Sequence, residues 1–201
     1  MGEARNRLSV KEFLAKAALH SDGKSFMVAE FGSEVTHRVM PAAELLFDPI
    51  MGCIKYDDAD ALQGIFDFAD GFGVDVFSIE LPLVNLETHE ETMVSMPEMC
   101  FAMDREACFS VALNRLLAVS KGSSEAHPLL HSLFESYAPA YGHPGLTAQR
   151  ARMVEKLVVG FMEVADSQGQ LQVALTLPLP PKILEVANRV AARSRMAKKS
   201  E

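Results

Sequence analysis

A recurring order of patterns constrains the fold of this chain most. An amphipathic helical stretch is followed by a turn that contains glycine and then by alternating apolar and polar residues, and the alternating stretches lie near residues 26, 77 and 173. Alternation with a period of two is typical of half-buried strands, and amphipathic helices need an apolar surface to cover. We therefore expect an α/β or α+β single domain, in which amphipathic helices pack on a mainly mixed sheet of about 4–6 strands.

Capping signals indicate where the helices begin and end. The stretch "SVKE" at 9–12 is typical of a capping box, which predicts a helix to about His20. Further helices are predicted from Asp58 to the "DGFG" stretch, from Asp104 to Gly122, from Thr147 to Gly169, and from Pro181 onward. Residues 84–103, rich in methionine, fit either short strands or a helix that begins at "THEE".

Three segments are predicted to be strands. Residues 24–31 and 34–40 flank Gly32-Ser33, a two-residue link of the kind that joins a hairpin. In that register His37 lies opposite Val28 on a half-buried face. The stretches 74–83 and 170–177 also alternate and are predicted to be strands.

Length and cysteine content define the broad class of protein. A chain of 201 residues can form one domain, 1–201, with frayed ends at about 1–7 and 195–201. Three cysteines without CxxC spacing indicate a reducing compartment, and the start carries no export signal. We expect a cytoplasmic protein that does not interact with membranes and needs no cofactor, and a homo-oligomer is compatible with the sequence.

Charge is unevenly distributed along the chain. Residues 57–106 carry thirteen acidic side chains against one base, Arg105, whereas residues 107–201 carry eleven bases against seven acids. Helix capping explains some of these acids but not the near absence of bases. We therefore expect an intracellular protein-interaction or regulatory module whose acidic face binds a basic protein partner. The candidate residues are Asp57, Asp58, Asp60, Asp67, Asp70, Asp75, Glu87, Glu90 and Glu91.

Two features qualify this interpretation. Methionines at 93, 96, 99 and 103 suit an irregular core, but a groove lined by methionine and rimmed by acids would favour partner binding over catalysis. Mere solubility of the acidic segment remains an alternative, and so does a Mg²⁺ site built from some of its carboxylates and Glu80.

A different class of function comes from "HPLLHSLFESY" at 127–137. His127, His131 and Glu135 have the spacing of metal ligands on a helix, which would suit a metal-assisted or acid/base hydrolase that also uses some of His89, Glu90 and the acids near Asp57. Pro128 disfavours helical geometry at His127, which we expect to lie at the helix cap. Cys53 is a weaker candidate nucleophile, in a predicted turn next to Lys55.

A third hypothesis concerns the basic C-terminal helix, 181–198. Lys182, Arg189 and Arg193 share one face of it, opposite an apolar face. Such a face could contact a nucleic-acid backbone, but cations near a helix C-terminus are also favoured by the helix dipole. Nucleic acid is therefore a less favoured partner than a basic protein.

Overall fold

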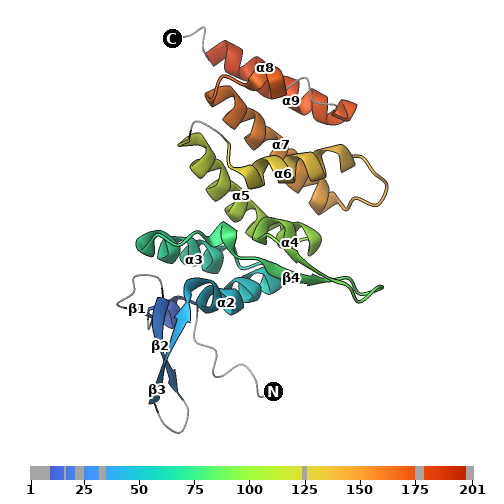
Figure 1. Cartoon of the computed structure of the whole chain (residues 1–201). Helices are drawn as coiled ribbons and strands as arrows, with labels where there is room; N and C mark the ends of the chain where they lie inside the picture. The colour runs from blue at the N-terminus through green and yellow to red at the C-terminus, as the bar shows by residue number, and fades with distance from the viewer. Residues whose placement is uncertain are drawn as a thin grey trace. The chain divides into compact units, whose positions relative to one another are not determined.

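The computed structural model describes residues 10–15, 17–20, 25–31, 35–123, 126–174 and 179–197 (Figure 1). The chain divides into two compact units, which we call unit 1, residues 1–108, and unit 2, residues 109–201. The division falls inside one continuous helix, α5 (Glu106–Lys121), and not in a linker. The prediction that the chain is a single domain stays a prediction.

Unit 1 combines helices with short antiparallel strands. Helices α2 and α3 pack on each other through a core that includes Leu46, Ile50 and Ile65, and α2 also packs on strands β2 and β3. The elements are α1 (Val10–Leu14), β1 (Ala18–Leu19), β2 (Ser25–Phe31), β3 (Val35–Pro41), α2 (Ala42–Tyr56), α3 (Ala59–Phe72), the 3-10 turn η1 (Val76–Ser78), β4 (Leu81–Val84), β5 (Glu91–Val94) and α4 (Met96–Ala102).

All the regular elements in the described residues of unit 2 are helices. Besides the rest of α5 it contains α6 (Pro128–Tyr137), η2 (Ala138–Ala140), α7 (Ala148–Ser167), α8 (Leu171–Ala174) and α9 (Pro181–Ala197). Helices α6, α8 and α9 all pack on α7. The buried Ser120 hydroxyl at the end of α5 accepts a hydrogen bond of 3.0 Å from the backbone N–H of His127, which links α5 to the start of α6.

The predicted fold class is wrong. In the described residues the strands form two small antiparallel sheets, one with the order β1-β2-β3 and one hairpin of β4 and β5, both in unit 1. Most helices pack on other helices, so no sheet of 4–6 strands organises the core. An apolar helical face can be covered by a second amphipathic helix as well as by a sheet, and the apolar pattern does not distinguish the two.

In two of the predicted strands, the first residues form helical turns instead. Within 74–83, the Asp75 carboxylate accepts a hydrogen bond of 3.0 Å from the N–H of Phe77 and begins η1, so the strand starts only at Leu81. Within 170–177, residues 171–174 form α8, with Leu171 and Ala174 buried one turn apart, and residues 175–178 lie outside the described part of the chain. Short apolar stretches fit a helical turn and a strand equally well.

The first hairpin exists, but its predicted register is wrong. Phe31 pairs with Val35, so the link is residues 32–34, and His37 lies opposite Ala29 instead of Val28. A shift of one residue exchanges the two faces of a strand. Phe26 and its partner Met40 are therefore buried, whereas Met27 and its partner Val39 are exposed. The burial predicted for the His37 side chain lies outside what the structure describes.

Most predicted helix boundaries are confirmed. Asp58 caps α3, whose end is Gly73 in the left-handed conformation, Thr147 caps α7, and Pro181 begins α9. The first helix is an exception, because α1 ends at Leu14 and β1 follows where the helix was predicted to continue. The helix predicted to start at Asp104 begins at Glu106, and Asp57 accepts hydrogen bonds from its first turn. The capping box in the ambiguous segment is Ser95 with Glu98 at the start of α4, and not "THEE".

The predicted frayed ends lie mostly outside the described residues. Residues 1–9 and 198–201 lie outside the described residues, and α9 continues to Ala197, within the predicted frayed range.

Among the helices that the structure describes, none combines the length and the apolar character that are needed to cross a bilayer.

Candidate functional site

Three of the predicted acidic site residues bind the backbone of their own chain. Asp58 accepts a hydrogen bond of 3.0 Å from the N–H of Ala61, and Asp75 accepts one from Phe77. Asp57 ends α2 in the left-handed conformation and accepts hydrogen bonds from the N–H groups of Ala107 and Cys108, at 3.3 and 2.9 Å. These carboxylates stabilise helix starts, which reduces their capacity to bind a partner.

Three more acids share one exposed side of α3. Asp60, Asp67 and Asp70 are exposed and fall within about 80° of one another at 100° per residue. The Asp67 carboxylate accepts a hydrogen bond of 2.8 Å from the side-chain amide of Gln63. None of these three residues lines either of the two hollows described below.

The remaining acids lie on the β4–β5 hairpin, which extends beyond the helices of unit 1 (Figure 1). Glu87 and Glu90 are in the connecting turn and Glu91 begins β5, all of them exposed. The Asn85 side-chain oxygen accepts hydrogen bonds from the N–H groups of Glu87 and Thr88, which orders the turn. The acids are therefore held on a structured projection.

A groove at the base of this hairpin brings acids and apolar side chains together. It has a volume of about 500 Å³ and is lined by Ala43, Glu44, Phe47, Asp48, Ser78, Ile79, Glu80 and Met93. On α2 the spacing of these residues gives two adjacent rows, because Ala43 lies one turn from Phe47 and Glu44 one turn from Asp48. Ile79 is buried and Met93 is exposed, so the groove has an apolar floor with carboxylates from two segments around it.

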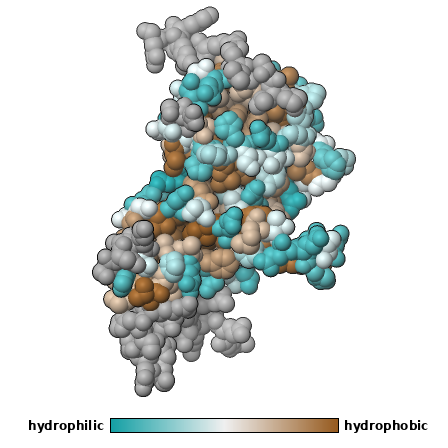
Figure 2. All heavy atoms as spheres, in the orientation of Figure 1, coloured by the Kyte–Doolittle hydropathy of each residue, from teal (hydrophilic) through white to brown (hydrophobic). Residues whose placement is uncertain are grey.

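Exposed apolar side chains are concentrated in unit 1. Among the described residues, seven large hydrophobic side chains of unit 1 are exposed, against one, Val119, in unit 2. Figure 2 shows a hydrophobic area over α2 beside the mostly hydrophilic hairpin. Exposed apolar surface with a polar rim is typical of protein interaction sites. The seven are Met27, Val39, Tyr56, Phe72, Val84, Leu86 and Met93.

The predicted metal ligands lie on or next to α6 in unit 2. His127 is the N-cap, as predicted, and its Nδ1 accepts a hydrogen bond of 3.2 Å from the N–H of Leu129. His131 and Glu135 line a hollow of about 580 Å³ together with Ala126, Pro128, Ser132, Ser136 and Gln170.

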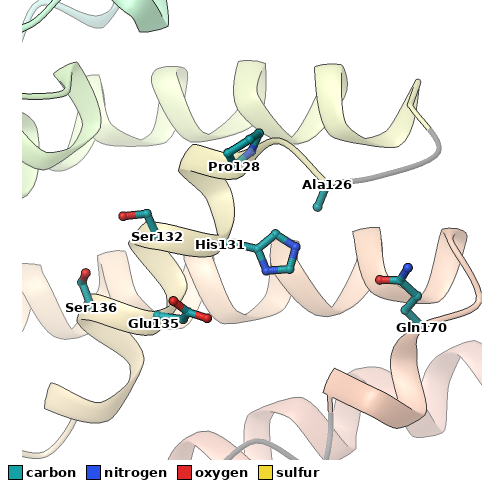
Figure 3. Close-up of a pocket in the computed structure, with 7 residues that line it drawn as sticks. All are labelled: Ala126, Pro128, His131, Ser132, Glu135, Ser136 and Gln170. Atoms are coloured by element: carbon teal, nitrogen blue, oxygen red, sulfur yellow. The ribbon is translucent and has the colours of Figure 1, made fainter.

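In the close-up of this hollow, the imidazole of His131 points toward the side on which Gln170 lies (Figure 3). The side chains of Ser132 and Ser136 lie on the other side of His131 from Gln170. No group of three or more His, Cys, Asp or Glu side chains suited to a metal occurs in the part of the chain that the structure describes. The other residues of the hydrolase hypothesis, His89 and Glu90, are on the hairpin of unit 1. Of the three predicted metal ligands, His131 and Glu135 share the hollow at α6, whereas His127 lies at the start of that helix.

Cys53 lies inside α2 and is buried, so the predicted turn is wrong. Burial first, and the negative charge of Asp58 second, raise the pKa of its thiol to about 11. Burial also raises the pKa of Cys108 to about 12, with Asp57 as the next cause, and that of Cys100 above its ordinary range. These thiols are protonated near neutral pH, which argues against a nucleophilic role.

The basic helix α9 has one packed and one exposed face. Ile183, Val186, Ala187 and Ala191 are buried, and α9 packs on α7. Lys182, Arg189 and Arg193 are exposed, as the sequence indicated. The cations are therefore presented by a helix whose apolar face is already covered.

The sequence predicted the hairpin acids as site residues but not the two acids of α2 that line the groove. Glu44 and Asp48 lie outside the strongly acidic segment, and their signal is the stretch "AAELLFDP", in which two acids one turn apart are adjacent to Ala43 and Phe47. No protein-family model matches the chain, and neither a curated protein nor a solved structure matches it.

Proposed function

We propose that unit 1 is a docking module that binds a basic segment of another protein. The observation that carries this proposal is the groove between α2, residues 78–80 and β5, where an apolar floor is combined with the carboxylates of Glu44, Asp48 and Glu80. The acids of the hairpin extend the negative field beyond the groove. A basic segment with apolar side chains is the ligand that matches both properties.

Charge and apolar burial have separate parts in this binding. Residues 1–108 have a net charge of −12, because residues 1–56 are balanced and residues 57–106 contribute the excess. A field of one sign accelerates association with a cationic partner. Exposed ion pairs contribute only about 0.2–1 kcal/mol each, whereas apolar burial contributes about 25 cal/mol per Å². Affinity therefore depends on the groove, and the acids select a basic partner.

The proposal is tested with the full-length protein and a fluorescent peptide of about 18 residues, made of leucine and lysine in a helical amphipathic order. Fluorescence anisotropy gives its Kd at about 20 mM and about 500 mM NaCl, between which the Debye length falls about fivefold. We expect binding that weakens at least about tenfold at the higher salt. An analogue with glutamate in place of every lysine is expected not to bind.

Matched double variants locate the binding site. Glu44→Gln with Asp48→Asn removes two carboxylates from the groove, and Asp60→Asn with Asp67→Asn removes two from the exposed side of α3. We expect the groove variant to weaken binding about three- to tenfold and the α3 variant less than twofold. Equal weakening of binding by the two double variants would mean that the peptide responds to the overall negative charge and does not occupy the groove. Binding of the glutamate analogue, or no binding of the lysine peptide at low salt, would contradict the proposal.

A further inference from the structure

The groove continues onto one face of the hairpin. Met93 pairs with Pro82 and Glu91 pairs with Val84, and residues two apart on a strand point to the same side, so these four side chains share a face. Val84 is 46% exposed and Met93 is 49% exposed, while the opposite face contains the buried Leu81. Because Met93 also lines the groove, apolar surface extends from Ile79 and Phe47 along the hairpin to Val84.

The backbone around this surface favours a helical ligand. Most backbone groups of α2 are used within the helix, and the groups of β4 and β5 that point toward each other bond across the hairpin. A segment that lies on this face, and not along the outer edge of β4 or β5, is therefore held mainly by side chains. An extended segment would leave its own N–H and C=O groups without protein partners, whereas a helix satisfies its own.

The spacing on the surface matches a helix. From the Met93 and Pro82 pair to the Glu91 and Val84 pair is two residues along a strand, about 7 Å. Apolar side chains at i and i+4 of a helix are about 6 Å apart along its axis. One apolar side chain of the ligand can therefore enter the groove while the next contacts Val84. The flexible thioether of Met93, between the two, can adapt to both.

We propose that the groove and this hairpin face together bind an amphipathic basic helix of another protein, with two apolar side chains one turn apart and lysine or arginine beside them. The inference rests on the proposed function and specifies the ligand of the same site. Glu44 and Asp48 flank the groove end, and Glu91 flanks the hairpin end, so cations are favoured along the whole length. Charge complementarity excludes an acidic helix.

A second copy of the chain offers no such ligand within the described residues. Helix α9 is basic, but Ile183 and Ala187 on its apolar face are buried and the helix packs on α7. It therefore presents cations without the apolar side chains that the groove requires. The occupant is a segment of a different protein.

Three peptides of leucine and lysine test the inference. The first has leucine at helical amphipathic positions, the second is its scrambled isomer with leucine on all sides, and the third has proline at one central lysine position of the first, which prevents a continuous helix. We expect the first peptide to bind at least about tenfold more tightly than either of the others. Equal affinity of the three would overturn the inference and leave the proposed function intact, whereas no binding of any peptide would overturn both.

A matched pair of methionine variants tests the surface itself. Met93→Ser removes the side chain shared by the groove and the hairpin face, and Met27→Ser changes an exposed methionine on β2 that does not line the groove. We expect Met93→Ser to weaken binding of the amphipathic peptide about fivefold or more and Met27→Ser to leave it unchanged, with both melting as the parent protein does. Equal effects of the two variants would overturn the inference. Sedimentation velocity would overturn it as well if the free protein formed a dimer that Met93→Ser dissociated.

Discussion

The carboxylate of Asp57 accepts a hydrogen bond of 2.9 Å from the backbone N–H of Cys108, fifty-one residues further along the chain. A second oxygen of the same carboxylate accepts from the N–H of Ala107 at 3.3 Å. Both N–H groups belong to the first turn of α5, where no preceding carbonyl can accept them. The end of α2 thus caps the start of α5, and a residue predicted to bind a partner has a structural role in unit 1.

Asp57→Ala is expected to lower the free energy of unfolding by about 1–3 kcal/mol. It removes both acceptors and also places alanine in the left-handed conformation, since Asp57 has φ 53°. Asp57→Asn should cost less, because asparagine keeps one acceptor oxygen and tolerates that conformation. Urea unfolding measures both variants, with the exposed Asp67→Ala as the control. If Asp57→Ala were as stable as Asp67→Ala, the cap would not contribute to the free energy of unfolding.

Gly160→Ala in α7 is expected to destabilise the protein by about 1–3 kcal/mol. A Cβ at this position would overlap the end of the Leu117 side chain on α5, so the two helices could keep their approach only with a shift of side chains or backbone. Gly64→Ala in α3 is the matched control, because nothing lies within 4 Å of its Cβ position. The same substitution there should stabilise the protein by about 0.5–1 kcal/mol.

Thermal unfolding of the two variants gives melting temperatures that should move in opposite directions. Leu117→Ala removes the side chain that the new Cβ would overlap. The loss of stability in the double variant Gly160→Ala with Leu117→Ala should therefore be smaller than the sum of the losses in the two single variants. Strict additivity of the two changes would mean that the close approach of Gly160 and Leu117 does not limit stability.

The buried thiols predict a loss of stability at alkaline pH. Burial raises the pKa of Cys53 from 9.0 to about 11, so the folded state keeps a proton that the unfolded chain releases. The resulting stability is fully present below pH 9 and is lost as the pH rises through 11. We expect the free energy of unfolding to fall over this window, and to fall less steeply in Cys53→Ala.

The measurement is urea unfolding at several pH values between 9 and 11. A thiol reagent provides an independent readout, because the protonated thiols of Cys53, Cys100 and Cys108 should react near pH 8 only as fast as the protein opens. Rapid labelling of Cys53 in the folded protein would contradict its burial and its raised pKa.

Features that depend only on residues close together in the chain were determined by the sequence itself. Asp58, Thr147 and Pro181 begin helices because their side chains or ring act within the first helical turn, and Pro128 makes His127 a cap for the same reason. The excess of acids in unit 1 also follows directly from the residues. Neither kind of feature requires knowledge of what packs on what.

The tertiary structure decided the rest, because it depends on partners far apart in the chain. The alternating residues 171–174 form a helical turn on α7 instead of a strand. A carboxylate in a run of acids, Asp57, became the cap of a helix about fifty residues away. The groove combines Glu44 and Phe47 with Met93, which no local pattern connects. An apolar pattern specifies that a face is covered, but only packing specifies which surface covers it.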